Sequence, residues 1–405
     1  MNHIIRQLTF AVLLIISIQA NSQITAPGAS GSQTTSFGDP IFFFSSSEGQ
    51  TLTYQASDAS ANYTYEWVKH NSSDNSWTNI LASGSGNQTS LVTTGEGGYG
   101  LKIIKTDGET DFYRCWVFEP AITNQSIEIT NEDCYGLTLE TNFDSKPLTC
   151  YNPVSGTAEN VTYNVTYTWT ATPAPDNAIA SSQTVELDAP FEDTNYTATI
   201  TDMAGQTSEA SLSYTAIAVE ANYSSEELKA DVPTEIHTTA EGSAPIEIRF
   251  TDESKGHITS WGWRFTNSNV SKSDQNPFHV FTTIGNDTVL LTVTNETCED
   301  IVDDPLVVII FESLVEAPNT FTPNGDGIND EFRVVYRSIK KFSMVIFNRW
   351  GRKVYVSSDP EEGWDGSIGN GQAPPGVYFY TIEAEGYDEN EKHKLSGPVH
   401  LIRGK

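Results

Sequence analysis

The sequence is short of basic residues and of long apolar runs, and each shortage excludes a class of function. Its 22 Lys and Arg stand against 53 Asp and Glu, for a net charge of −31. This excess of negative charge repels phosphate backbones and anionic lipid surfaces, so we expect no binding to nucleic acid. After residue 22, no run approaches the roughly 20 apolar residues of a membrane-spanning helix. We therefore expect no transmembrane span in the mature chain.

Cysteines are also few. The four cysteines, at positions 115, 134, 150 and 298, lack the CxxC spacing that is typical of zinc sites. An exported chain can form disulfides, and four cysteines allow three complete pairings. The short separation of Cys134 and Cys150 favours that pair. Buried free thiols are the alternative.

Catalytic motifs are missing as well. No HExxH, GxSxG or GxxxxGK[ST] pattern occurs, and the seven histidines are scattered. Acidic pairs such as Asp303 and Asp304 lie in acidic runs, which is typical of solvated surface charge. We therefore predict no catalytic residue, no cofactor and no metal ligand, and hence no enzyme. A cryptic hydrolase with two distant carboxylates or a His-containing triad is one alternative.

The N-terminus has the pattern of an export signal. His3 and Arg6 give a weakly basic start, and residues 8–18 form a nearly unbroken apolar run that is too short to span a bilayer. Small residues follow at 20–22, so we place a signal peptide at residues 1–22 and the mature N-terminus near Gln23. A buried core helix is the other reading of this segment.

The composition favours an all-β protein. The chain holds 17 Tyr, 19 Phe and 8 Trp beside abundant Thr, Val and Ile, and long helical patterns are absent. Trp67, Trp169 and Trp263 recur at a spacing close to the roughly 100 residues of an immunoglobulin-like sandwich. We predict tandem β-sandwiches at 23–131, 132–221 and 222–314, with each tryptophan in a core. A ligand-binding aromatic is the alternative for each.

The third unit resembles PKD domains, which are immunoglobulin-like. The resemblance lies in PIEIRFTD at 245–252, ITSWGWRF at 258–265, NPFHVF at 276–281 and VLLTVTN at 289–295. The turn that usually reads WDFGDG in the family reads WRFTNS at 263–268. This departure weakens any role for turn carboxylates. The resemblance implies a spacer or a protein- or glycan-contacting module, not a catalyst.

The last part of the chain differs in charge. From Val315 onward there are 11 Lys and Arg against 13 Asp and Glu, which leaves 11 against 40 before that position. Five blocks follow in order: PNTFTPNGDGINDEF at 318–332, IFNRWGRKVY at 346–355, GWDG at 363–366, PPGVYFY at 374–380 and GPVHLIR at 397–403. Residues 315–405 therefore resemble the gliding motility-associated, type B sorting domain of type IX secretion in Bacteroidota. Turn pairs and alternating stretches predict a small β-sandwich here.

The resemblance implies handling by the type IX translocon and attachment machinery. It assigns to the sorting motif Pro323, Asn324, Gly325, Asp326, Gly327, Asn329, Asp330, Asn348, Arg349, Trp350, Gly351, Trp364, Asp365, Gly366, Pro375, Gly376, Tyr378 and Arg403. We expect the turn residues and the last strand, with Arg403 and Lys405, to be exposed for recognition. The oxygen-rich loop at 324–330 is interpreted as a hydrogen-bonded turn, and a calcium site is the alternative.

These patterns together predict an exported, non-enzymatic protein of the cell surface or medium. Its sandwiches would be structural or adhesive, with an unknown protein or glycan ligand. We expect the first unit to contact the ligand, because it is rich in Ser, Asn and Tyr. A carbohydrate-binding accessory protein of a polysaccharide-degrading system is the other alternative, and exposed, coplanar aromatics on one sandwich would favour it.

Overall fold

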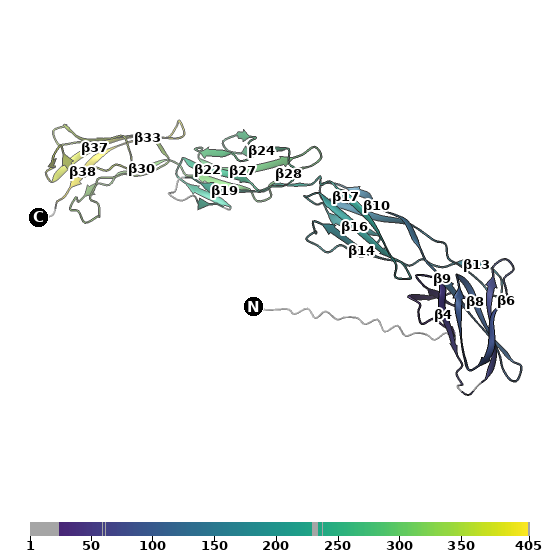
Figure 1. Ribbon diagram of the computed structural model, residues 1–405. Coiled ribbons are helices and arrows are strands. Elements are labelled where there is room, and N and C mark those ends of the chain that lie inside the picture. The colour runs from purple at the N-terminus through teal and green to yellow at the C-terminus, as the bar shows by residue number, and fades with distance from the viewer. Residues whose placement is uncertain (1–23, 59, 61, 229–233, 237, 404–405) are drawn as a thin grey trace. The chain divides into compact units, whose positions relative to one another are not determined.

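The computed structural model describes residues 24–403 except 59, 61, 229–233 and 237, and all regular elements in this part are β-strands. The chain forms two compact units (Figure 1). Unit 1 runs to Glu132 and includes Leu137–Leu187 and Thr194–Tyr214, whereas unit 2 takes Asp133–Gly136, Asp188–Asp193 and the chain from Thr215. The all-β prediction is confirmed. The predicted signal peptide lies outside the described residues.

Unit 1 begins with a sandwich of two sheets around one core. The larger sheet has the order β2 (Gly31–Thr34), β3 (Pro40–Phe43), β9 (Thr110–Phe118), β8 (Gly97–Ile104), β5 (Tyr63–Asn71), β6 (Ser76–Gly86), and the smaller one β1 (Ile24–Thr25), β4 (Glu48–Gln55), β7 (Gln88–Thr94). Leu52 of β4, Trp67 of β5 and Leu101 of β8 meet in the same cluster of buried side chains. Inward apolar residues alternate with outward polar ones along β4, as the period of two requires.

The rest of unit 1 is a second sandwich. One sheet has the order β10 (Ile122–Glu132), β11 (Gly136–Ser145), β15 (Thr184–Asp188), and the other β14 (Thr166–Thr172), β16 (Thr194–Thr201), β17 (Thr207–Tyr214), with the short pair β12 (Thr149–Tyr151) and β13 (Ala158–Asn160) beside them in sequence. Leu139 of β11, Trp169 of β14 and Tyr196 of β16 share one buried cluster.

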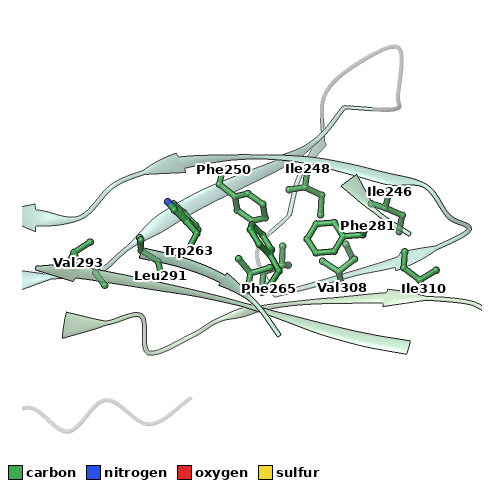
Figure 2. Close-up of a cluster of buried hydrophobic side chains, with 14 of the residues drawn as sticks. Ile246, Ile248, Phe250, Trp263, Phe265, Phe281, Leu291, Val293, Val308 and Ile310 are labelled. Atoms are coloured by element: carbon green, nitrogen blue, oxygen red, sulfur yellow. The ribbon is translucent and has the colours of Figure 1, made fainter. Parts of the chain in front are cut away.

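The first sandwich of unit 2 has a core rich in aromatic rings. One sheet has the order β20 (Thr234–Glu235), β19 (Tyr223–Glu227), β22 (Ile246–Asp252), β26 (Phe278–Phe281). The other has the order β21 (Thr239–Gly242), β29 (Leu306–Ile310), β27 (Gly285–Thr294), β24 (Ser260–Phe265), β25 (Val270–Lys272), and β28 (Glu299–Ile301) also pairs with β27. A separate pair consists of β18 (Val219–Glu220) and β23 (Lys255–Gly256). Figure 2 shows Phe250, Trp263, Phe265 and Phe281 pointing into the space between the sheets.

The C-terminal domain has its own core. Its main sheet runs β31 (Thr320–Phe321), β38 (Lys392–Leu401), β37 (Gly376–Gly386), β33 (Ile339–Phe347), β34 (Lys353–Ser357), and two short pairs join β30 (Leu314–Glu316) to β32 (Val335–Arg337) and β35 (Ser367–Ile368) to β36 (Gly371–Gln372). Met344 and Ile346 of β33 pack with Phe332 and Trp364. The alternate residues of β33 and β37 point to the opposite face, which we call the free face because its described residues are exposed or half-buried.

The three repeated tryptophans are core residues, as predicted. Trp67, Trp169 and Trp263 are 0%, 7% and 1% exposed. Each indole N–H also has an acceptor, at Thr89 Oγ1, Ser182 O and Asp274 O respectively. Since a buried indole needs such a partner, the polar tip fixes the ring in place while its faces fill the core.

The disulfide is not the pair that the sequence favoured. Cys134, in the turn between β10 and β11, is bonded to Cys298, 164 residues further along, and both belong to unit 2. The ten-residue strand β11 follows Cys134 and carries the chain roughly 30 Å away before Cys150 is reached. Cys115 and Cys150 are buried free thiols, and burial raises the pKa of both.

None of the described residues belongs to a helix long and apolar enough to cross a membrane. The sandwich boundaries at 131, 221 and 314 stay a prediction.

Candidate functional site

The motif loop after β31 is a turn held by one carboxylate. Asp330 Oδ1 accepts the backbone N–H groups of Asn324 (2.9 Å) and Gly325 (2.7 Å), and Oδ2 accepts that of Gly327 (2.8 Å). Hydrogen bonds from Gly325 and Gly327 lead the causes that lower the pKa of Asp330. Gly325 and Gly327 both have φ +83°, a conformation that glycine adopts without strain.

The same loop does not have the ligand pattern of a calcium site. Asp326 Oδ1 accepts the N–H of Ile328, and its Oδ2 accepts the side-chain amide of Asn324. Asn329 has φ +52°, and its carbonyl accepts the N–H of Thr322. The oxygens are thus turned towards the loop's own donors. In the part of the chain that the structure describes, no group of three or more His, Cys, Asp or Glu side chains could hold a metal ion.

The Arg403 side chain is half-buried and joins separate segments through hydrogen bonds. This corrects the expectation that Arg403 is exposed for recognition. Its guanidinium donates to the carbonyl of Pro323 (3.2 Å) and to that of Gly366 (3.0 Å). Strand β38, which precedes it, pairs with β37 along its length, and with β31 only at its last two residues, His400 and Leu401. The sequence could not show this, because the two-residue strand β31 that pairs with the end of β38 is too short to give a pattern. Lys405 lies outside the described residues.

The GWDG block belongs to the core. Trp364 is 0% exposed, donates its indole N–H to Ser367 O and packs against Tyr378 at 4.9 Å between ring centroids. Asp365 accepts the N–H and the hydroxyl of Ser367, and the pKa of Asp365 is lowered chiefly by that hydroxyl. Gly366 has φ +75° and lies against Arg403.

The PPG block at 374–376 leads into β37 and, like the GWDG block, is held in the fold by a hydrogen bond from an aromatic side chain. The hydroxyl of Tyr378 donates to the carbonyl of Pro374, one residue before Pro375. Gly376 has φ +151° at the start of β37. Burial raises the pKa of Tyr378, whereas Arg403 and Arg349 lower it. The register places Phe379, near the start of β37, opposite Phe347 before the β33–β34 turn and opposite Pro398 near the end of β38, so the motif blocks meet at one end of the domain.

The hairpin between β33 and β34 is the exposed part of this end. Asn348 Oδ1 accepts the N–H groups of Trp350 (3.0 Å) and Arg352 (3.1 Å), and Gly351 turns the chain with φ +77°. The Trp350 side chain is 74% exposed, with the Arg349 guanidinium 4.2 Å above its ring centroid. A well-ordered turn thus presents one large aromatic and its cation to solvent.

The free face of the main sheet carries exposed apolar residues that the sequence reasoning did not single out. Phe379 is 47% exposed, Val377 is 41% exposed and Val356 is 60% exposed. Phe379 lies opposite Phe347 on one side and opposite Pro398 on the other. The signal was present in the run VYFY, because alternate residues of a strand point to opposite faces and an apolar run therefore places apolar residues on both.

No catalytic triad is formed among the described residues. Ser313 Oγ lies 2.7 Å from His393 Nε2, which is the geometry of a nucleophile and a base. The nearby Glu391 carboxylate accepts the backbone N–H of Ser313 and not a proton of the imidazole. In residues 24–403 as described, no carboxylate is hydrogen-bonded to His393, so the acid that orients the base is missing. The hydrolase alternative gains no support.

Two family models match the chain. The model of the CHU_C type IX secretion signal domain matches residues 315–400, and the model of the PKD domain matches residues 229–303. The chain therefore carries a type IX secretion signal domain at its C-terminal end and a PKD domain before it, and both resemblances are confirmed. Such a signal domain implies export to the cell surface or the extracellular space. A comparison with curated proteins finds no match.

Several solved structures of repeated domains are similar to the chain. The tetra-tandem repeat in the extending region of a large adhesion protein is 14% identical with a TM-score of 0.26, over 88% of this chain and 96% of that one. The N-terminal four Ig domains of Dscam1 isoform 7.44 are 12% identical with a TM-score of 0.29, over 92% and 97%. A Ca²⁺-stabilised adhesin with which an Antarctic bacterium binds ice is 8% identical with a TM-score of 0.26, over 89% and 96%. TM-scores this low carry no conclusion about what this chain does.

Proposed function

We propose that the chain is an exported, non-enzymatic protein of a bacterial surface, whose domain at 315–405 directs it through the type IX translocon and attachment machinery. The observation that carries the proposal is the match of residues 315–400 to the type IX signal family. The core around Trp364 supports it, because a machine that recognises folded cargo needs a stable surface to read. In this proposal, the three sandwiches that precede this domain carry the binding surface.

The ligand-contacting role falls to the first sandwich in this proposal. Ile80 and Val92 are more than half exposed on it, and Phe112 lies beside the half-buried Trp77. The rings of Trp77 and Phe112 stand at 80° to each other. A flat sugar-stacking platform needs coplanar rings, so the carbohydrate-binding alternative draws no support from this pair. The ligand in this proposal is a protein or a glycan.

Export of the full chain tests the proposal. The chain, with an epitope tag after residue 23, is expressed in a gliding bacterium with an intact type IX system and in a translocon-deficient derivative. A second version ends at Leu314. We expect surface or medium delivery of the full chain in the intact strain only, and periplasmic retention of the shortened version in both. Equal delivery of both versions would mean that the C-terminal domain is one more structural module.

A further inference from the structure

The free face of the main sheet in the C-terminal domain is divided into two unlike halves. The half next to the hairpin carries Val377, Phe379 and Pro398, with Val356 on the edge strand β34. Among the described residues, none of these four belongs to the core cluster of the domain. We define the apolar half as Phe347, Val356, Val377, Phe379 and Pro398. Single exposed apolar residues are ordinary, but neighbours on adjacent strands form a patch.

The other half of the face is charged and carries residues of both signs. Lys341 pairs with Glu385 at 2.6 Å, and Lys394 pairs with Glu383 at 3.0 Å across neighbouring strands. These pairs occupy the same face, since Thr381 separates Phe379 from Glu383 by the period of two. A sheet face that only had to stay in water would show this pattern along its whole length. The apolar half therefore calls for a separate explanation.

The hairpin next to the apolar half holds three cations, one of which, Arg349, lies over the Trp350 ring. Within the described part of the chain, no carboxylate lies within the 4.0 Å of an ion pair from Arg349, Arg352 or Lys353. Trp350 projects from the same turn. Trp and Arg are the residues that most often dominate the energy of protein interfaces, and the Asn348 hydrogen bonds have already ordered the turn that presents them.

We propose that the apolar half and the hairpin tip together form the surface by which this domain docks onto a protein of the type IX machinery. The partner's site is an apolar surface bordered by carboxylates, which would take Trp350 and Phe379 at its centre and pair with the three cations at its rim. This inference rests on the proposed sorting function and names the part of the domain that performs it.

The charges favour a different protein over a second copy of this chain. A two-fold contact through this face would bring the same patch together from both copies. If the two-fold axis passed near the hairpin tip, Arg349, Arg352 and Lys353 of one copy would lie close to the same three residues of the other. Like charges at an interface are unfavourable, so self-association centred on the hairpin is opposed.

The first test is delivery of variants of the full chain in the intact and the translocon-deficient strain. Trp350→Ala combined with Phe379→Thr is compared with the control Lys394→Ala on the charged half of the same face. Because interface hot spots dominate binding, we expect the double variant to reach the surface or medium about tenfold less, and the control to stay within about twofold of the parent. Unchanged thermal unfolding of the purified double variant shows that it is folded.

The second test identifies the partner. A photo-crosslinking amino acid is placed at Phe379, or at Lys394 as the control, in the full chain. We expect a crosslink from position 379, and not from 394, to a component of the type IX machinery, with the crosslink lost in the translocon-deficient strain. Crosslinking from 379 to a second copy of the chain would overturn the inference.

The two proposals fail in different ways. If the parent chain is delivered equally in both strains, the sorting function itself is wrong. If the parent needs the translocon but the folded double variant is delivered as well as the parent, or positions 379 and 394 crosslink alike, the sorting function stands and the docking surface is wrong.

Discussion

The third sandwich and the C-terminal domain each bury an aromatic cluster around one tryptophan, but they distribute their other apolar residues differently. Among described residues, the third sandwich leaves three large apolar side chains exposed, at Phe278, Val280 and Ile301. The C-terminal domain leaves seven, at 328, 335, 350, 356, 377, 379 and 402. The third sandwich also holds Cys298, which is bonded to Cys134 in the turn between β10 and β11, whereas the C-terminal domain has no cysteine. Few exposed apolar side chains and a disulfide suit a spacer that must resist unfolding. Many exposed apolar side chains suit a surface that a partner protein must recognise.

The largest effect should come from removing the central tryptophans. Trp263→Ala and Trp364→Ala should each lower the free energy of unfolding of their own domain by about 3–5 kcal/mol, because each leaves a cavity among packed rings. Trp350→Ala should cost less than about 0.5 kcal/mol, since this side chain is mostly in water. Hydrogen exchange read by mass spectrometry in peptides of β24 and β37 separates the domains, which need not unfold together. An equal loss of protection from Trp350→Ala would contradict the exposed placement of that ring.

Reduction of the disulfide should affect the third sandwich and leave the C-terminal domain unchanged. Loss of the Cys134–Cys298 bond, by reductant or by Cys298→Ser, should destabilise the third sandwich by about 2–4 kcal/mol, because the open chain gains freedom when unfolded. Protection of the β27 amides against hydrogen exchange should fall, and that of the β37 amides should not. The matched control is Cys150→Ser under reductant, which shows the contribution of a free thiol. A fall in β37 protection as large as that in β27 would remove this difference between the domains.

The two domains also differ in how a carboxylate holds a turn. Asp287 is buried and accepts the N–H groups of Asn267 (3.0 Å) and Ser268 (3.1 Å), in the turn that departs from the PKD pattern. Asp287→Asn should destabilise the third sandwich by about 1.5–3 kcal/mol, since bonds to a charged acceptor are the strong ones. Asp330→Asn, in the exposed loop of the C-terminal domain, should have a smaller effect. Urea titration of both variants gives the comparison, and a larger effect at Asp330 would reverse it.

The smallest effect should be a pH dependence confined to the third sandwich. Burial lowers the pKa of His279 below its ordinary 6.5, Lys272 acts in the same direction and Asp287 opposes it. The unfolded state therefore binds the proton more tightly, so this contribution to stability is present at neutral pH and is lost as pH falls through 6.5 towards the folded pKa. Scanning calorimetry should show the transition of this domain falling over that range, and less so in His279→Gln. The exposed His400→Gln is the control, and an identical pH profile in both variants would exclude His279 as the cause.

The sequence was sufficient for the fold class and for the type of the last two domains, because those depend on patterns that survive in short segments. Alternation and the spacing of Trp67, Trp169 and Trp263 report directly on burial. The ordered sequence blocks after Val315 identify a domain family, and they too are read from short segments. Neither kind of pattern requires knowledge of which strands pair in the fold.

What the sequence could not supply were the contacts that depend on topology. Cys134 and Cys298 meet because of how the strands between them are arranged, and sequence distance favoured Cys150 instead. Arg403 was expected to be exposed, but the short β31 pairs beside β38 and places its carbonyl neighbour Pro323 within reach. The apolar half of the free face needed the register of β33, β37 and β38 before its members could be recognised as neighbours.

The bond between Cys134 and Cys298 has a mechanical consequence for the chain under tension. Polypeptide extends to at most about 3.3–3.6 Å per residue, so the sequence separation of 164 between the two cysteines corresponds to roughly 550 Å of extended chain. Tension applied at the two chain ends passes across the sulfur–sulfur bond, and the backbone between them carries none. While the disulfide is intact, the residues between the two cysteines therefore add nothing to the length of the chain under tension. Reduction would allow them to extend as well.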